Sequence, residues 1–283
     1  MIHTSESLYG DLSALGVPEG ALLAVHSSFR ALGQVEGGPE AVVRALQRAV
    51  GERGTLLFPT FTTNLTDPEH WPVPPPPEER ERLLETIPLF DPGASEPHKM
   101  GAIAIQAWKT AGAIRSRHPV SSWTAIGPLA EELARDHSLD DPEGPRSPIG
   151  RVHERDGWVL LLGVSHDADT TIHLAESLLD LPHLRVLPDR YPALDGSGRR
   201  VWREIAKTTK CSDGFTRLEE DLQRAGAIRW RQVGDARSQL LRSREIVRVA
   251  TERLRCDPTS LLCDDPRCVH CPTSRAVLTG IAS

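Results

Sequence analysis

The stretch LLLGVSHDADTTIHLAESL, residues 160–178, joins an apolar run to a segment with helical spacing. The run WVLLLGV, residues 158–164, is short, apolar and uncharged, which is typical of a buried strand. After it, Ile172, Leu174 and Leu178 recur at the spacing of one helix face. Because alternating strands and helices build layered α/β domains, this stretch predicts an α/β fold.

The same alternation occurs on the N-terminal side. Residues 21–25 are a second apolar run, Pro39 to Val50 has one apolar helical face, and residues 55–62 are a third run, a pattern that favours parallel pairing. Further elements are expected as helices over residues 5–16, 100–116, 128–137, 212–226 and 243–258, a strand over 118–127 and a hairpin within 182–201. We therefore predict a three-layer sandwich, with helices on both faces of a largely parallel or mixed central sheet.

Residues 64–98 interrupt this pattern. They include WPVPPPPEER, residues 71–80, whose proline run is too stiff and too poor in N–H donors for an inner strand or a helix. Long surface loops of this kind are either functional lids or disordered segments, and both interpretations stay open here.

Bulk composition describes an ordinary globular protein. With 283 residues and 39% hydrophobic content, the chain is predicted to be a single domain over residues 1–283, with a cysteine-rich segment, residues 256–283, packed on it. A secretory signal and an apolar run of about 18 residues are both missing from the sequence, so we expect a soluble cytoplasmic protein that binds no membrane, as a monomer or homodimer. The net charge of -6 and scattered Lys and Arg argue against nucleic acid and favour a cationic ligand, although solubility alone explains a modest negative charge.

Polar groups follow each of the three predicted strands. HSS (residues 26–28), PTFT (59–62) and SHDADTTIH (165–173) all fall at carboxyl ends, where ligands collect in α/β sheets. His173 and Glu176 are three residues apart on one helix face, and an imidazole paired with a carboxylate is the usual general base near neutral pH. The alternative for His173, a histidine that merely fills the surface or the core, is about equally favoured by the residues alone.

Three other polar stretches are open to two interpretations. Asp169 is a good helix cap, which the pattern favours over catalysis. The turn after residue 25 offers hydroxyls and backbone N–H groups to an anion, yet Ser27 and Ser28 also suit an ordinary turn. Arg115 and His118 provide cations near a strand start, or belong to a solvated loop.

The cysteines point to a metal. Cys263, Cys268 and Cys271 include a C-x-x-C knuckle, whose spacing lets two thiolates reach one zinc ion. A fourth ligand is needed, and Cys256, His270 and Cys211 are the candidates. We favour Cys211, because it would tie the C-terminal segment back to the body of the protein. The alternative is a set of buried cysteines without a metal.

Several blocks, taken together and in order, resemble one enzyme family. LLAVHSSFRALG (residues 22–33), RSRHPVSSWTAIGP (115–128) and SPIGRVHERDGWVLLLGVSHDADTTIHLAE (147–176) are similar to the aminoglycoside 3-N-acetyltransferases, which are acetyl-CoA-dependent and confer antibiotic resistance. The resemblance runs from about residue 6 to residue 180 and more loosely to the end. It implies that family's α/β fold and transfer of acetyl from acetyl-CoA to the 3-amino group of the 2-deoxystreptamine ring of an aminoglycoside.

The resemblance also assigns residue roles. It implies His173 as general base with Glu176 as its partner, and substrate contacts from Asp167, Asp169 and Thr170. The residues implied to bind the coenzyme are Ser27, Ser28, Phe29, Arg30, Arg115 and His118. One departure is notable: the family often has Asn-Thr where this chain has Asp169-Thr170. KCSDGF and CDDPRCVHC resemble the zinc-containing branch that acetylates apramycin and gentamicin, with Cys211, Cys263, Cys268 and Cys271 as the implied ligands.

The implied chemistry suits these residues, because an aminoglycoside ammonium must be bound and deprotonated before its nitrogen can attack a thioester. Direct transfer makes the serines ligands and not nucleophiles. Two other functions compete with it. One is a metal-dependent hydrolase with His166, Asp167, Asp169 and His173 as ligands, and the other is a non-catalytic binding module held by zinc.

Overall fold

The computed structural model describes residues 1–71, 73–185, 189–205 and 211–278. Within these residues the central sheet has seven strands in the order β10-β11-β7-β2-β4-β6-β5. Their bounds are β2 Leu22–Ser27, β4 Thr55–Pro59, β5 Ile114–Arg115, β6 Trp123–Ile126, β7 Trp158–Leu162, β10 Arg229–Val233 and β11 Ala236–Arg242. β2 pairs in parallel with β4 and β7, and the other pairs are antiparallel. The predicted α/β fold is confirmed, with a mixed sheet.

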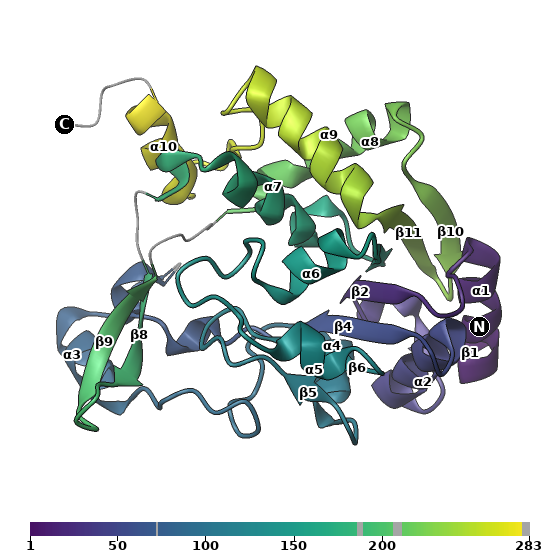
Figure 1. Ribbon diagram of the computed structural model, residues 1–283, viewed down its shortest axis with the longest axis horizontal. Helices are drawn as coiled ribbons and strands as arrows, with labels where there is room; N and C mark the ends of the chain where they lie inside the picture. The colour runs from purple at the N-terminus through teal and green to yellow at the C-terminus, as the bar shows by residue number, and fades with distance from the viewer. Residues whose placement is uncertain (72, 186–188, 206–210, 279–283) are drawn as a thin grey trace.

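Helices cover both faces of this sheet (Figure 1). Leu23 and Val25 of β2 belong to one apolar core with α1 (Ser5–Leu15), α2 (Gly38–Val50) and α4 (Gly101–Lys109). Their neighbours Leu22 and Ala24 belong to a second core with α5 (Ala130–Ala134), α6 (Pro148–Glu154), α7 (Thr171–Leu179), α8 (Glu219–Arg224) and α9 (Ser243–Cys256). Since successive side chains of a strand point to opposite faces, an uninterrupted apolar strand supplies both cores.

Smaller elements surround the sandwich. β1 (Ile2–His3) pairs with β3 (Gln34–Val35), and β8 (Asp189–Leu194) forms the predicted hairpin with β9 (Arg200–Ile205). This hairpin and α3 (Pro77–Thr86) lie at one end of the molecule, opposite α1 (Figure 1). The last described helix is α10 (His270–Leu278). No helix in the described part of the chain has the length and apolar character needed to cross a membrane.

Two expectations about elements were wrong, and two strands were missed. Residues 64–98 were expected to be irregular, yet α3 begins at Pro77, the last proline of the run, since proline is tolerated in a first helical turn. The helix expected over residues 100–116 ends at Lys109, and Ile114 and Arg115 form β5. β10 and β11 were not predicted, because four of the five residues of edge strand β10 are exposed and show no apolar alternation.

Candidate active site

A cavity of about 580 Å³ opens at the carboxyl ends of β2, β4 and β7. His26 and Ser27 reach it from β2, while Asp167, Thr170 and His173 reach it from the segment after β7. Pro59, the last residue of β4, and Asp189, the first residue of β8, also line it, and the remaining wall is formed by Phe61, Thr63, Lys99, Met100, Val120, Ser121, Glu143, Val164, Ala168 and Ser212. The polar segments that follow the three strands therefore meet at one place, as their positions at the sheet edge predict.

His173 and Glu176 form a close pair on the cavity wall. The Nδ1 atom of His173 lies 2.5 Å from Oε2 of Glu176, and the imidazole side chain is 12% exposed. Burial by itself lowers the pKa of His173, but Glu176, and beyond it Glu143 and Asp169, raise that pKa above its ordinary value. Because the carboxylate occupies Nδ1, Nε2 is the ring nitrogen left to accept a proton from a ligand.

Glu143 is a cavity residue that sequence reasoning missed. Its carboxyl group is buried, and burial raises its pKa to about 7, partly offset by the charge of His173 and a hydrogen bond with Ser121. The loop that carries it is anchored by a contact of 2.8 Å between Nε2 of His137 and the carbonyl oxygen of Pro142. The proline- and glycine-rich loop LDDPEGPRS, residues 139–147, contains no spacing that would mark one of its acids for the cavity.

Of the three residues predicted to bind substrate, two line the cavity. Asp167 and Thr170 are on its wall, but Asp169 is fully buried outside the lining. Its Oδ1 accepts a hydrogen bond of 3.1 Å from the N–H of Thr171, and its Oδ2 lies 3.5 Å from Nδ1 of His166. The prediction that Asp169 contacts substrate is therefore corrected: its carboxylate is internal and accepts one backbone N–H at the start of α7, from the position before the N-cap Thr170.

The residues predicted to bind coenzyme through the HSS turn are only partly at the cavity. Ser27 lines it. The N–H of Ser28 donates to the carbonyl oxygen of Leu162 at 2.9 Å, and Phe29 packs against the apolar core. Arg30 is exposed. The turn thus presents Ser27 to the cavity and Arg30 to the solvent beside it.

Arg115 is not available to a phosphate, which corrects its predicted role. The residue is 7% exposed, and its guanidinium donates to the carbonyl oxygens of Thr60 and Ser95 at 2.5 Å and to Oγ of Ser122 at 3.0 Å. Burial lowers its pKa to about 10, so the guanidinium stays charged near neutral pH. Its hydrogen bonds connect three segments of the chain inside the protein. Its donors are occupied by the protein itself.

His118 is also internal and cannot act as the predicted cation. It is fully buried, and its Nδ1 accepts hydrogen bonds from the N–H groups of Val120 and Ser121 at 3.1 and 2.9 Å. Burial lowers its pKa to about 4, so the ring is neutral near pH 7. It shapes the turn that carries Ser121 to the cavity.

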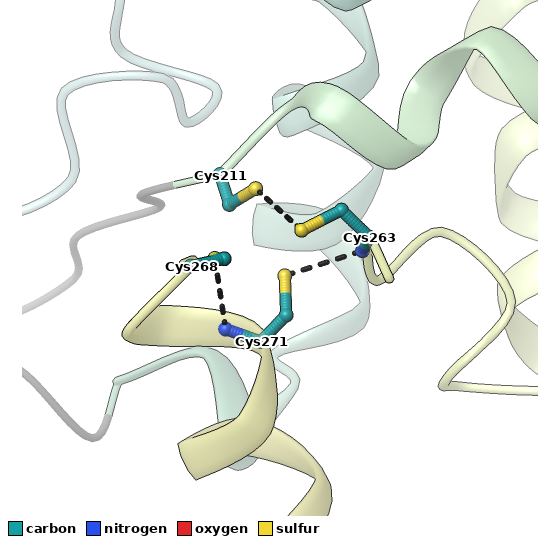
Figure 2. A group of neighbouring side chains, drawn as sticks. All are labelled: Cys211, Cys263, Cys268 and Cys271. Atoms are coloured by element: carbon teal, nitrogen blue, oxygen red, sulfur yellow. Dashed lines mark hydrogen bonds between the residues drawn. The ribbon is translucent and has the colours of Figure 1, made fainter. Parts of the chain in front are cut away.

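Four cysteines gather in a second cluster (Figure 2). The Sγ atoms of Cys211, Cys263, Cys268 and Cys271 all lie within 4.8 Å of one another. The backbone N–H of Cys263 donates to Sγ of Cys271 at 3.3 Å, and that of Cys271 donates to Sγ of Cys268 at 3.4 Å. Cys256 is exposed and outside the group. The structure therefore brings together the four residues favoured as metal ligands.

The histidine and aspartate cluster of the hydrolase alternative does not converge on one point. Among the described residues, the cysteine cluster is the group of His, Cys, Asp and Glu side chains close enough to share an ion. His166 and Asp169 are fully buried, whereas Asp167 and His173 line the cavity. The geometry does not support a metal-dependent hydrolase at these four residues.

Comparison with known proteins gives one consistent result. The sequence model described as aminoglycoside 3-N-acetyltransferase matches residues 24–255. Aminoglycoside N(3)-acetyltransferase VII of Streptomyces paromomycinus is 37% identical over 258 residues, which cover 86% of this chain and 88% of that protein. Among solved structures, a histidine-to-alanine mutant of aminoglycoside acetyltransferase AAC(3)-IVa in complex with a gentamicin has a TM-score of 0.84 and 33% identity, covering 97% of each chain. The binary complex of AAC-IIIb with CoASH has a TM-score of 0.77 and 30% identity, covering 90% of this chain and 97% of the other.

Proposed function

Since this chain belongs to the aminoglycoside 3-N-acetyltransferase family, we propose that it transfers the acetyl group of acetyl-CoA to the 3-amino group of an aminoglycoside, with His173 as general base. The observation that carries the assignment of the base is the pair of His173 and Glu176 on the wall of the large cavity. Two relatives of similar fold, solved with CoASH and with a gentamicin, support the choice of donor and acceptor.

The cavity suits a cationic acceptor. Glu143, Asp167 and Asp189 are carboxyl groups on its wall, and Lys99 is the one Lys or Arg among its described lining residues. An aminoglycoside carries several ammonium groups near neutral pH, and carboxylates in a partly desolvated cavity bind such groups through charge-assisted hydrogen bonds. These acids therefore hold the antibiotic and orient one amine toward His173.

The reaction needs a proton acceptor and no covalent enzyme intermediate. The ammonium first gives up one proton to solvent, and the amine nitrogen then attacks the thioester carbon while Nε2 of His173 takes the second proton. The tetrahedral oxyanion collapses with cleavage of the C–S bond, and the leaving CoA thiolate accepts the proton from His173, which leaves the amide and the neutral base. Ser27 and Thr170 place hydroxyl groups on this wall, and these are our proposed donors to the oxyanion.

The cysteine cluster fits a structural zinc ion. With zinc–sulfur distances of about 2.3 Å, tetrahedral geometry places sulfur atoms about 3.8 Å apart. The four sulfur atoms lie within 4.8 Å of one another, and Cys211 and Cys263 are 3.5 Å apart. The set supplies four soft ligands with no position left for water, so the ion would hold the C-terminal segment on the protein and take no part in acetyl transfer.

The decisive experiment measures thiol release from acetyl-CoA with a panel of aminoglycosides, including one whose 3-amino group is blocked. We expect turnover with unblocked antibiotics only. His173→Ala should lower kcat by about 10²- to 10⁴-fold, because a general base contributes that much. Its affinity for acetyl-CoA, measured by calorimetry, should stay within a factor of a few. Wild-type turnover in His173→Ala would remove the assignment of the base.

A further inference from the structure

The segment that starts at Cys211 runs directly from the cysteine cluster to the candidate active site. Cys211 belongs to the cluster, and the next residue, Ser212, lines the cavity. Phe215 is fully buried, and its ring meets the His173 imidazole edge to face, with 4.7 Å between the ring centroids. Five consecutive residues thus contain a cluster ligand, part of the cavity wall and the aromatic neighbour of the base.

The backbone at Gly214, in the same segment, packs closely against residues 261–263, which include the cluster residue Cys263. A Cβ atom on Gly214 would lie 2.1 Å from the carbonyl oxygen of Leu261 and 3.0 Å from the backbone nitrogen of Cys263. Glycine is therefore required for the two backbones to approach this closely. Cys263 follows within two residues of the contact, so a movement of that ligand is transmitted to the backbone beside Phe215.

Arg217 ties the segment that starts at Cys211 to the chain around Cys263, and Arg275 ties α10 to that same chain. Arg217 donates to the carbonyl oxygen of Leu262 at 2.8 Å and pairs with Asp264. Arg275 donates to the carbonyl oxygens of Cys263 and Leu262 at 2.8 and 3.1 Å. Phe215 and Leu261 are also buried in the same apolar core, and the cysteine cluster adds a further link between the two segments (Figure 2).

We propose that metal binding by the four cysteines positions the catalytic base, through Ser212 in the cavity wall and Phe215 against His173. The proposal rests on the proposed function and extends it, because it makes the cluster a determinant of turnover and not only a clamp on the C-terminal segment. Phe215 acts as a positioning residue in this scheme.

The physical reason is that removal of the ion leaves the four cysteine sulfur atoms without a common ligand. A tetrahedral ion holds four sulfur atoms at set distances, and metal binding of this kind contributes directly to folding of the ligand segments. Without it, Cys211 is free to shift, and Ser212 and Phe215 shift with it. Glu176 lies on the same helix as His173, so their pair survives while the ring loses its aromatic support. A base displaced by about 1 Å can cost 10²-fold in rate.

The test compares metal content with kinetics in matched variants. Cys211→Ser should lose bound zinc, measured by atomic emission, and should lower kcat by about ten- to 10²-fold. Cys256→Ser, an exposed cysteine outside the cluster, should keep zinc and wild-type kinetics. Removal of zinc from wild type with a chelator should have the effect of Cys211→Ser, and added zinc should restore kcat.

A second variant separates coupling from misfolding. Phe215→Leu keeps the cluster intact and fills most of the same apolar volume, so it should retain one zinc ion per chain. It should nevertheless lower kcat by about tenfold and change the NMR signals of the His173 ring, because the contact with the imidazole is lost. Full zinc content together with unchanged kcat in Phe215→Leu would overturn the proposal.

The remaining outcomes are distinguishable. If zinc-free wild type that keeps its fold turns over at the wild-type rate, the cluster is only a clamp and the proposal fails. If zinc-loaded wild type transfers acetyl to no aminoglycoside, the proposed function itself fails, whatever the variants do.

Discussion

Two histidine–carboxylate pairs with the same spacing lie close together in this chain, but one pair is buried and the other lies on the cavity wall. His166 and Asp169 are three residues apart and fully buried, 3.5 Å from each other. His173 and Glu176 have the same separation but lie on the cavity wall. Spacing alone treats both pairs as candidate bases. The tertiary structure separates them, because only the second imidazole can reach a ligand.

The pH dependence of turnover follows from this pair. Glu176 raises the pKa of His173 above its ordinary value, and the base must be neutral to act. Activity should therefore rise with pH through that raised pKa, above about 6.5. In Glu176→Gln the pKa of His173 falls, so the acidic limb of the kcat/KM profile should move to lower pH, while kcat on the plateau drops because the base is weaker. If the acidic limb of the kcat/KM profile is unchanged in Glu176→Gln, that limb reports the ionisation of a group other than His173.

Glu143 should control acceptor affinity. Its pKa of about 7 means that it ionises between about pH 6 and 8, and only the ionised form attracts an ammonium. KM for the aminoglycoside should therefore fall as pH rises through 7. Glu143→Gln should raise that KM by about ten- to 10²-fold, since a charge-assisted hydrogen bond is worth about 1.5–3 kcal/mol.

KM for acetyl-CoA should change little in Glu143→Gln, which is the internal control. Steady-state kinetics with both substrates varied would check this. An equal rise in both KM values would mean that the substitution distorts the cavity as a whole.

At the scale of elements, the hairpin of β8 (Asp189–Leu194) and β9 (Arg200–Ile205) is attached to the segment before α3 by Asp67. The carboxylate of Asp67 is 1% exposed and accepts from Nε of Arg190 at 2.5 Å, while its N–H donates to the carbonyl oxygen of Arg190 at 3.0 Å. Asp189, the residue before Arg190, lines the cavity. The irregular segment predicted over residues 64–98 thus shapes the site through a specific contact.

Asp67→Ala should therefore lower both stability and acceptor affinity. It leaves the Arg190 guanidinium, which is 45% exposed, to water, so we expect a loss of about 1–2 kcal/mol in the free energy of unfolding and not the full cost of a buried pair. Calorimetric Tm and KM for the aminoglycoside are the measurements. Glu69→Ala, which breaks the exposed pair with Arg80, should change stability by less than about 1 kcal/mol. Equal effects of the two variants would contradict this role for Asp67.

At the scale of the whole molecule, the charge distribution suits a polycation. The chain has a net charge of -6, and the cavity wall carries three acids. Electrostatic attraction of this kind raises association rates and weakens with salt. We expect kcat/KM for the aminoglycoside to fall several-fold between about 20 and 200 mM salt, where the Debye length shortens from about 20 Å to less than 8 Å. Stopped-flow binding at the two salt concentrations would test this, and an unchanged association rate would argue against steering.

Resistance in cells is the corresponding prediction for the whole protein. Expression of the chain in a susceptible bacterium should raise the minimal inhibitory concentration of those aminoglycosides that it acetylates. His173→Ala at equal expression should not. Protection by His173→Ala would point to sequestration of the antibiotic instead of its modification.

Local sequence patterns predict the layers of the fold, the strand ends where the site forms and the His173–Glu176 pair, because apolar periodicity and i, i+3 spacing are local properties. The sequence also singled out the cysteines, whose chemistry is specific. The burial of Arg115 and His118 and the presence of Glu143 at the cavity follow from tertiary structure alone, which also brings Cys211, the ligand favoured from the sequence, into the cluster and leaves Cys256 outside it. These features depend on which distant segments of the chain pack beside each residue. Burial by such segments shifts the pKa of a charged group and decides whether a side chain can contact a ligand.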